Sequence, residues 1–488
     1  MLVEFKTLGL NLQKLPMNSN IESQLERFKS GFPFINLDRS AVLEDGILSF
    51  SESETESLIA DYENEKKDFR ILKFVPASGA ATRMFKELFA GVVELENGKS
   101  LNAAATIFIN NLPNFVFYRA LKELLSSSSE VLENPTEVAN QLVILKTILY
   151  DNGLGFGNKP KGAIPFHEVN GNAETPVFNH ILEGLSYAGS ENKVQIHFTI
   201  SNEHEKLFND LVDRYLKEFP TVDFNIHFSN QLQETNTVAV NLDNQPILTE
   251  GEFLMRPSGH GALLENLNTL HADLVFIKNI DNVVKPELEP ESSKYKKLLA
   301  GLLLEKKKTI FQLLNELDKG EIKAAMAFVK KEFGLNIIDI ETLKLALNRP
   351  IRVCGMVKNT GEPGGGPFWV KDMEGNSTLQ IVEKSQIDIS DKKQLEILQN
   401  STHFNPVDLA CWLTDFKGNA FELLKYRDDE TGFITEKSFQ GAPIKALELP
   451  GLWNGAMADW ITYFIEVPLH TFNPVKTVLD LLKPNHST

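Results

Sequence analysis

The sequence predicts an α/β fold built on a Rossmann-like, mostly parallel mixed sheet. Between residues 176 and 229, two helical patterns alternate with two strand patterns over short connections. Such alternation is typical of parallel strands with helices on the faces of the sheet. Apolar runs at residues 72–75 and 273–280 have the length and composition of buried strands. We therefore expect one α/β core that begins near residue 71.

The stretch at residues 72–84, LKFVPASGAATRM, is the first candidate site. Small residues and a proline separate the strand pattern from a helical pattern that begins at Thr82, so a ligand can approach the backbone closely. The free N–H groups and the dipole of a helix N-terminus favour an anion at such a loop. Arg83 adds a cation suited to phosphate. The alternative is an ordinary strand-to-helix turn with a surface arginine.

Composition and charge exclude several classes of function. The chain has 488 residues and a formal net charge of −17, from 66 acidic against 49 basic residues, which argues against broad binding of nucleic acid or anionic membranes. No apolar run is long enough to span a bilayer, and the first residues lack the pattern of a secretory signal. Cys354 and Cys411 lie among apolar residues and are expected to be reduced core thiols. These features predict a cytoplasmic protein.

The chain is expected to divide into three regions. Residues 1–70 are predicted to form an N-terminal helical region. Residues 71–385 are predicted to form the core, with helical insertions at about 90–150 and 290–348, of which the second is expected to be a solvated subdomain because its helical faces are rich in lysine. Residues 386–488 are expected to complete the core and the active site.

Two further loops carry candidate functional residues. Residues 153–167, GLGFGNKPKGAIPFH, form a glycine- and proline-rich loop that contains Lys161. Within residues 256–284, a Gly-His-Gly loop opens a helix, and the apolar run that follows delivers Asp281 at the C-terminal end of a strand. Ligands of open α/β sheets gather at that edge, and a carboxylate there suits a divalent metal. The alternative for Lys161 is a solvated loop lysine, and the alternative for Asp281 is a turn or cap residue.

These stretches resemble, in the same order along the chain, the signatures of the nucleotide-diphospho-sugar transferase superfamily, and in particular of UDP-sugar and UDP-glucose pyrophosphorylases. The matches are Gly79, Thr82, Arg83 and Met84 to G-x-G-T-R-M/L; Pro160, Lys161 and Gly162 to P-K-G; residues 257–261 to P-x-G-H-G; residues 279–282 to N-I-D-N; Ile381, Val382 and Glu383 to V-V-E-Y-S; and residues 471–482 to F-x-P-V-K-x-x-x-D-L-L. The resemblance suggests a bacterial branch of this superfamily with its own helical insertions.

The resemblance implies a GT-A-type nucleotidyltransferase core that joins a sugar 1-phosphate to a nucleoside triphosphate, with UTP as the first choice, and releases pyrophosphate. It implies Mg²⁺ as cofactor, and a nucleoside triphosphate and a sugar phosphate as partners, with no nucleic acid and no membrane. The implied residues are Arg83, Lys161 and Lys476 for catalysis; Ala77, Ser78, Gly79, Ala80, Ala81, Thr82, Gly259, His260 and Gly261 for the nucleotide; Asp281 for the metal; and, as weaker candidates, Glu383, Asn405 and Asp408.

Ala81 is the main departure from the family pattern, because it stands where the second glycine of the nucleotide loop is expected. A methyl group there could crowd a phosphate, and a positive φ would cost about 1–2 kcal/mol. This departure and the split between Arg83 and Lys161 favour an alternative, a catalytically weak or inactive nucleotide-sugar-binding protein of the same fold. A glycosyltransferase is a third hypothesis, with less support because no D-x-D pattern ends a predicted strand.

Overall fold

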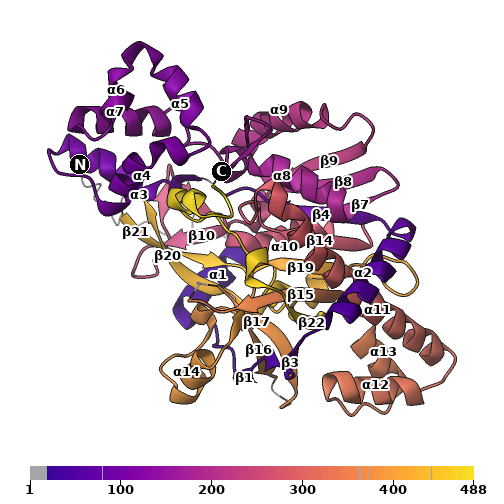
Figure 1. Cartoon of the computed structure of the whole chain (residues 1–488). Coiled ribbons are helices and arrows are strands. Elements are labelled where there is room, and N and C mark those ends of the chain that lie inside the picture. Colours follow the sequence, from indigo (N-terminus) through magenta and orange to yellow (C-terminus); the bar gives the residue numbers. More distant parts are fainter. Residues whose placement is uncertain (1–18, 80, 362–363, 373, 441, 488) are drawn as a thin grey trace.

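The computed structural model describes residues 19–79, 81–361, 364–372, 374–440 and 442–487. An eleven-stranded mixed sheet forms its centre (Figure 1). The strands along the sheet are β2 (Val42–Leu43), β3 (Gly46–Leu48), β22 (Ile461–Glu466), β15 (Ile351–Lys358), β19 (Asp408–Trp412), β14 (Leu274–Lys278), β4 (Ile71–Pro76), β8 (Lys193–Ile200) and β7 (Gly189–Ser190), with β9 (Asp223–Asn230) paired to β8 and β18 (His403–Phe404) paired to β15.

Parallel pairing predominates in this sheet, as predicted. Strands β14, β4, β8 and β9 are parallel neighbours, and so are β15, β22 and β3. Strand β19 lies antiparallel between β14 and β15 and joins the two parallel halves. The C-terminal ends of β4, β8 and β14 therefore meet at one edge, where ligands of open α/β sheets bind.

Side chains of the central strands alternate between two hydrophobic clusters, as the pleat of a strand requires. On one face, Leu274 and Phe276 of β14 join a cluster with α2 (Glu52–Glu65) and α11 (Glu289–Asp318). On the other face, Val275 and Ile277 pack with α10 (Leu263–Asn268). Helices α8 (Pro176–Glu183) and α9 (Glu205–Leu216) pack beside β8.

The prediction that the second insertion is a solvated subdomain is wrong for its longest helix. Helix α11 buries an apolar stripe from Leu298 to Leu304 against the sheet. Its lysines flank this stripe, so the charged composition concealed a core helix. Helices α12 (Lys323–Phe333) and α13 (Ile340–Leu347) follow it and pack against one another and against α11.

Five helices between residues 86 and 149 form a lobe with its own apolar core (Figure 1, upper left). They are α3 (Lys86–Glu96), α4 (Ala103–Asn110), α5 (Tyr118–Leu124), α6 (Glu130–Glu133) and α7 (Val138–Leu149). The buried rings of Phe108, Phe115 and Phe117 lie in this core. So do Val475 and Val478, which come from more than 300 residues later in the chain and tie the lobe to the rest of the molecule.

The prediction of a mostly helical region at residues 1–70 is corrected at residues 37–48, while residues 1–18 lie outside the described part. Helix α1 (Ser19–Ser30) and α2 are present, but β1 (Leu37–Ser40), β2 and β3 lie between them. Strand β1 pairs with β16 (Gly366–Lys371), which pairs with β17 (Ser377–Val382). The partners are distant in sequence, so the tertiary fold decided the conformation of this segment.

Smaller elements surround the sheet. They are β5 (His167–Val169), β6 (Asn172–Glu174), β10 (Thr237–Val240), β11 (Leu248–Thr249), β12 (Glu252–Phe253), β13 (Met255–Arg256), α14 (Lys392–Gln399), β20 (Phe433–Phe439) and β21 (Ala442–Glu448). Among the described residues, no helix combines the length and the apolar character that crossing a bilayer requires.

Candidate functional site

The two halves of the proposed phosphate loop lie side by side, although about eighty residues separate them in sequence. The backbone N–H of Ala81 donates to the carbonyl oxygen of Lys159 (3.0 Å), and that of Lys161 donates to the carbonyl oxygen of Gly79 (3.1 Å). The helical lobe therefore leaves the loop after β4 and returns to it. Ala80 lies outside the described residues.

Lys161 and Asp281 form an ion pair at the carboxyl edge of the sheet. The Nζ atom of Lys161 lies 2.7 Å from Oδ2 of Asp281 and donates a second hydrogen bond of 2.7 Å to the carbonyl oxygen of Val475. Each side chain of the pair is 12% exposed, so solvent reaches both. Lys161 carries three N–H donors, and this arrangement uses two of them.

The segment that contains Lys476 lies across both loops. The N–H of Val475 donates to the carbonyl oxygen of Asp281 (3.1 Å), and that of Val478 donates to the carbonyl oxygen of Met84 (3.1 Å). The side chain of Lys476 is exposed. Three of the matched motifs, from residues 79–84, 279–282 and 471–482, thus meet through backbone contacts.

Arg83 and Thr82 lie on the outer side of the nucleotide loop. Both are exposed, in a 3₁₀ turn at Ala81–Arg83. Gly79 is exposed too, and a Cβ atom built on it would meet no atom within 4 Å. This open surface leaves room for a ligand to approach the backbone at Gly79. Ala77 is buried instead, and its N–H donates to the carbonyl oxygen of Thr199 (2.9 Å).

Ala81 does not crowd the loop. It begins a 3₁₀ turn, a conformation with negative φ, so the conformational cost considered for alanine does not arise. Its side chain is 0% exposed and packs with Met84 and Phe85 in the core of the helical lobe. The methyl group therefore points into the lobe core, and Ala81 no longer favours an inactive protein.

We expect Ala81→Gly to lower the free energy of unfolding by about 1–2 kcal/mol, because it removes a buried methyl group and adds backbone freedom. Nucleotide affinity should not rise. The matched variant is Gly79→Ala, whose added methyl group enters open space, so stability should hold while phosphate binding weakens. Urea unfolding and calorimetric titration of both variants measure this. A gain in affinity in Ala81→Gly would contradict the buried orientation.

The Gly-His-Gly loop packs against a turn that the sequence analysis did not single out. The ring of His260 stacks on Trp453, with centroids 4.3 Å apart and an interplanar angle of 21°. Gly259 has φ +77°, and a Cβ on it would come within 2.4 Å of Oε2 of Glu448. The positive φ favours glycine there, and the Glu448 side chain would have to move to admit a larger residue. The signal that could have indicated Trp453 is its place in the glycine-rich turn PGLWNG.

Glu383 joins the same cluster. Its Oε1 accepts a 2.7 Å hydrogen bond from Nδ2 of Asn454 and lies 3.8 Å from Nε2 of His260. Asn405 is buried and lies beside the glycine-rich turn at residues 361–366, since its N–H donates to the carbonyl oxygen of Gly365 (2.8 Å).

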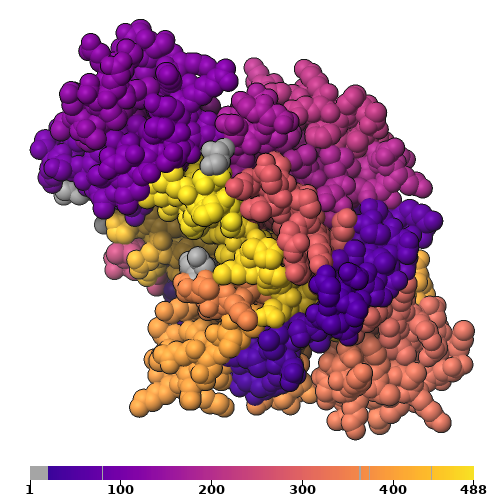
Figure 2. All heavy atoms as spheres, in the orientation of Figure 1, coloured from indigo at the N-terminus to yellow at the C-terminus, as the bar shows by residue number. Residues whose placement is uncertain are grey.

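The face of the molecule drawn in Figure 2 has a hollow between the helical lobe and the orange segment, with the yellow C-terminal region beside it.

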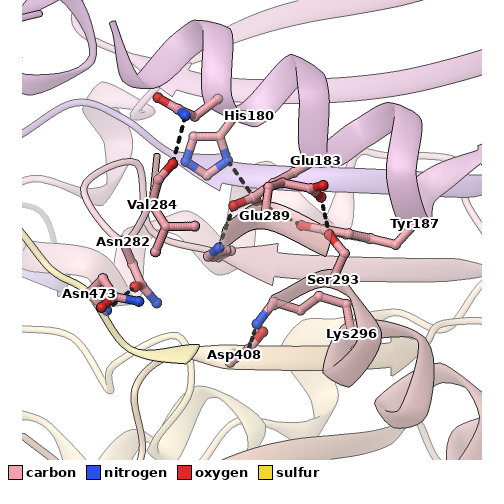
Figure 3. Close-up of polar contacts among 12 residues, drawn as sticks. His180, Glu183, Tyr187, Asn282, Val284, Glu289, Ser293, Lys296, Asp408 and Asn473 are labelled. Atoms are coloured by element: carbon pink, nitrogen blue, oxygen red, sulfur yellow. Dashed lines mark hydrogen bonds and ion pairs between the residues drawn. The ribbon is translucent and has the colours of Figure 1, made fainter. Parts of the chain in front are cut away.

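Asp408 belongs to a buried charged web rather than to an open surface (Figure 3). It pairs with Lys296 of α11, and it is the ladder partner of Lys278 at the end of β14. Oε1 of Glu183 lies 2.5 Å from Nζ of Lys278, and its Oε2 lies 2.7 Å from Nζ of Lys73. All five side chains are at most 2% exposed.

Apart from Asp408, the sequence analysis did not single out the members of this web, and their pKa values are shifted by different causes. Burial lowers the pKa of Lys73 to about 8 and lowers that of Lys296 strongly. Burial alone would raise the pKa of Glu183, but Lys278 and Lys73 hold it well below its usual range. The web therefore lies at the end of β14, three residues before Asp281, and the charge of each member is stabilised by its partners.

Asp281 was predicted to bind a metal, and the donor set around it is small. Among the residues that the structure describes, no group of three or more His, Cys, Asp and Glu side chains could hold a metal ion. The Asp281 carboxylate stands instead beside one ammonium group. Mg²⁺ in nucleotide sites is often held by one or two carboxylates together with substrate phosphates, so this donor set fits only a metal that is shared with a phosphate ligand.

A family model matches residues 9–487. The chain belongs to that family, which is described as a domain of unknown function (DUF4301). No curated protein matches the chain.

Two solved structures are similar to the chain over most of its length. One is the uridine diphosphate N-acetylglucosamine pyrophosphorylase from Trypanosoma brucei in complex with an inhibitor, at 13% identity and a TM-score of 0.48, covering 95% of this chain and 74% of that one. The other is the UDP-glucose pyrophosphorylase from Leishmania major, at 12% identity and a TM-score of 0.43, with coverage of 95% and 74%.

Proposed function

We propose that the chain is a nucleotidyltransferase that joins a sugar 1-phosphate to a nucleoside triphosphate, with UTP as the preferred nucleotide, and releases pyrophosphate. The observation that carries the proposal is the convergence of the matched motifs. Lys161 is hydrogen-bonded through its backbone to Gly79 and through its Nζ to Asp281 and Val475. These residues come from four separate stretches, and the resemblance assigns all four to the phosphate end of one site.

In this proposal, catalysis consists of positioning and charge neutralisation, because the attacking phosphate oxygen is already anionic. It attacks the α-phosphorus in line with the leaving pyrophosphate. Arg83 and Lys161 would hold the pyrophosphate, and the third N–H of Lys161 is the donor available to it. Lys476 would hold the attacking sugar phosphate. The Gly259–Gly261 loop would lie against the base.

Asp281 would hold Mg²⁺ in this proposal, together with oxygens of the bound triphosphate. Mg²⁺ at that position would supply neutralisation of the developing phosphate charge. Asp281 also orients Lys161 through the 2.7 Å contact. A single carboxylate thus has two tasks, to anchor the lysine and to accept the metal that enters with the nucleotide.

Release of pyrophosphate is the direct test. A coupled assay with Mg²⁺ would compare UTP with the other nucleoside triphosphates across a panel of sugar 1-phosphates. Turnover with at least one pair is expected. A thermal-shift screen of the same compounds separates the alternative, because a ligand of the folded state raises the unfolding midpoint by mass action. Shifts with nucleotide sugars and no turnover would favour a binding protein. The absence of both turnover and thermal shifts would contradict both functions.

A further inference from the structure

Residues 472–487 form a segment that runs from Asp281 to a buried histidine pair. At its start, the N–H of Asn473 donates to Oδ1 of Asn282 (2.8 Å), and both residues lie together in Figure 3. The next contact joins the N–H of Val475 to the carbonyl oxygen of Asp281 (3.1 Å). The segment thus continues the strand end that carries Asp281.

The middle of the segment fixes the backbone of Lys476. Oδ2 of Asp480 accepts hydrogen bonds from the N–H groups of Lys476 (2.9 Å) and Thr477 (2.7 Å). The N–H of Val478 donates to the carbonyl oxygen of Met84 (3.1 Å). Lys476 is therefore held between Asp281 and the loop that contains Arg83, although its side chain is exposed.

The far end of the segment is anchored by His486, which is 3% exposed. Its Nδ1 lies 2.9 Å from Nε2 of His167. Nδ1 of His167 lies 3.0 Å from Oδ1 of Asn179, whose Nδ2 donates to the carbonyl oxygen of Val284 (2.9 Å). The chain of contacts returns to the stretch that follows Asp281.

The hydrogen-bond directions in this chain are determined by chemistry. Asn179 donates to a carbonyl oxygen, so its Oδ1 must accept from Nδ1–H of His167. In the neutral ring, Nε2 of His167 is then an acceptor, and His486 must donate from its own Nδ1–H. A single proton can lie between the two facing nitrogens, so protonation of both rings would place two N–H groups against each other. The contact is therefore lost when both rings are protonated.

A second anchor lies next to the first. Nδ2 of Asn485 donates to Oδ1 of Asn473, and the carbonyl oxygen of Asn485 accepts from the N–H of Lys285 (3.2 Å). The residue before His486 is thus bonded to the residue that begins the segment. Docking of His486 and the placement of residues 473–478 are parts of one hydrogen-bonded unit.

We propose that His486 is a positioning residue: its contact with His167 holds residues 473–478 in place, and so keeps Lys476 at the phosphate end of the site. The role assigned to Lys476 rests on the proposed function, whereas the docking of the segment does not. His486 itself touches no reacting atom.

The charged groups around the pair determine how docking depends on pH. Asp480 and Lys483 face His486, while Lys285 and Glu287 face His167. Burial dominates and lowers the pKa of His167 to about 4 and that of His486 to about 3. A released histidine would titrate near 6.5. Release therefore takes up protons between about pH 3 and 6.5, so docking weakens as the pH falls below about 6.5.

Hydrogen exchange measured by mass spectrometry tests the docking. In His486→Ala, the peptides that cover residues 472–482 should exchange at least about tenfold faster than in the wild type, because local opening exposes their N–H groups. His486→Asn places an amide donor where Nδ1 stood and should restore most of the protection. His271→Ala, which removes an exposed histidine before β14, should change nothing. If these peptides exchange at the wild-type rate in His486→Ala, the proposal is overturned.

Steady-state kinetics test the positioning. In His486→Ala, kcat should fall by about 10- to 100-fold, and KM for the sugar phosphate should rise more than KM for the nucleotide, because Val475 of the same segment also contacts Lys161 and Asp281. In the wild type, activity should fall below about pH 6.5 because docking of the segment weakens. In His486→Ala this fall in activity should be absent. Faster exchange with wild-type kinetics would overturn the positioning role. If the wild type has no turnover, the proposed function fails, and the exchange experiment still decides whether His486 holds the segment.

Discussion

Glu183→Gln is expected to lower the free energy of unfolding by about 3–5 kcal/mol, because it removes one partner from buried ion pairs. Glu183 is 2% exposed and faces Lys73 at 2.7 Å and Lys278 at 2.5 Å. Glutamine has the same shape, but its amide group would present an N–H to one of these ammonium groups. Two buried lysines would then lack a counter-charge. Chemical unfolding at pH 7 measures the loss.

The loss in Glu183→Gln should shrink as the pH rises. A buried lysine without a partner deprotonates in the folded state, and the cost of doing so falls as the pH approaches the pKa of about 10.4 that lysine has in the unfolded chain. Lys73 is already shifted to about 8. Stability of the variant relative to the wild type should therefore improve from pH 7 to pH 9.

Glu289→Gln is the matched control, at a carboxylate whose charge acts on Glu183 and Lys73 of this web. Glu289 is only partly buried, burial raises its pKa, and it accepts a hydrogen bond from Ser293. Its replacement should cost less than about 1 kcal/mol, as for a typical hydrogen bond. Equal losses in the two variants, or a loss in Glu183→Gln that does not depend on pH, would show that the ion pairs of Glu183 do not stabilise this fold.

Asp281→Asn is expected to reduce kcat of the proposed reaction by about 10²–10³-fold, the range for loss of one group that stabilises a transition state electrostatically, while the fold is retained. The amide can still accept a hydrogen bond from Lys161, but it no longer balances the ammonium charge or offers a carboxylate to Mg²⁺. Stability should fall less than in Glu183→Gln, because the side chains of this pair are 12% exposed whereas that of Glu183 is 2% exposed. Turnover at several Mg²⁺ concentrations and thermal unfolding measure the two effects.

Asp273→Asn is a control on the same strand system. Asp273 precedes β14 and pairs with Arg70 at 2.7 Å, at the opposite edge of the sheet from Asp281. The substitution removes an ion pair at the other end of β14 and leaves the site intact, so kcat should remain at the wild-type value. A wild-type rate in Asp281→Asn at limiting Mg²⁺ would contradict the metal role, and equal losses in both variants would point to a general effect on β14.

The local patterns of the sequence were sufficient for the α/β class, and they placed Lys161 and Asp281 at the carboxyl edge of the sheet, where the structure has them. The spacing of apolar residues indicates which face of each helix or strand is buried. A strand followed by small residues and a helix indicates a turn that a ligand can approach. Lys161 and Asp281 were both expected in the phosphate site, and they lie 2.7 Å apart. Their individual roles stay predictions.

Features that depend on the direction of a side chain were not accessible from the pattern. Ala81 reads as a missing glycine in the sequence, but the turn directs its methyl group into the lobe core. The lysine-rich stretch of α11 reads as a solvated helix, but its apolar stripe covers the sheet. Composition gives the residues of an element, whereas the packing around it decides which of them are buried.

The sequence by itself determined the alternation of strands and helices in the core and the chemical character of the loops, because these depend on residues close together in the chain. The tertiary structure alone decided the pairing of Lys73 and Lys278 with Glu183, and of His167 with His486, which lies 319 residues later. Each of these groups is costly to bury alone and becomes tolerable only beside its partner. No periodicity records such a dependence, since the partner is fixed by the fold and not by its distance along the chain.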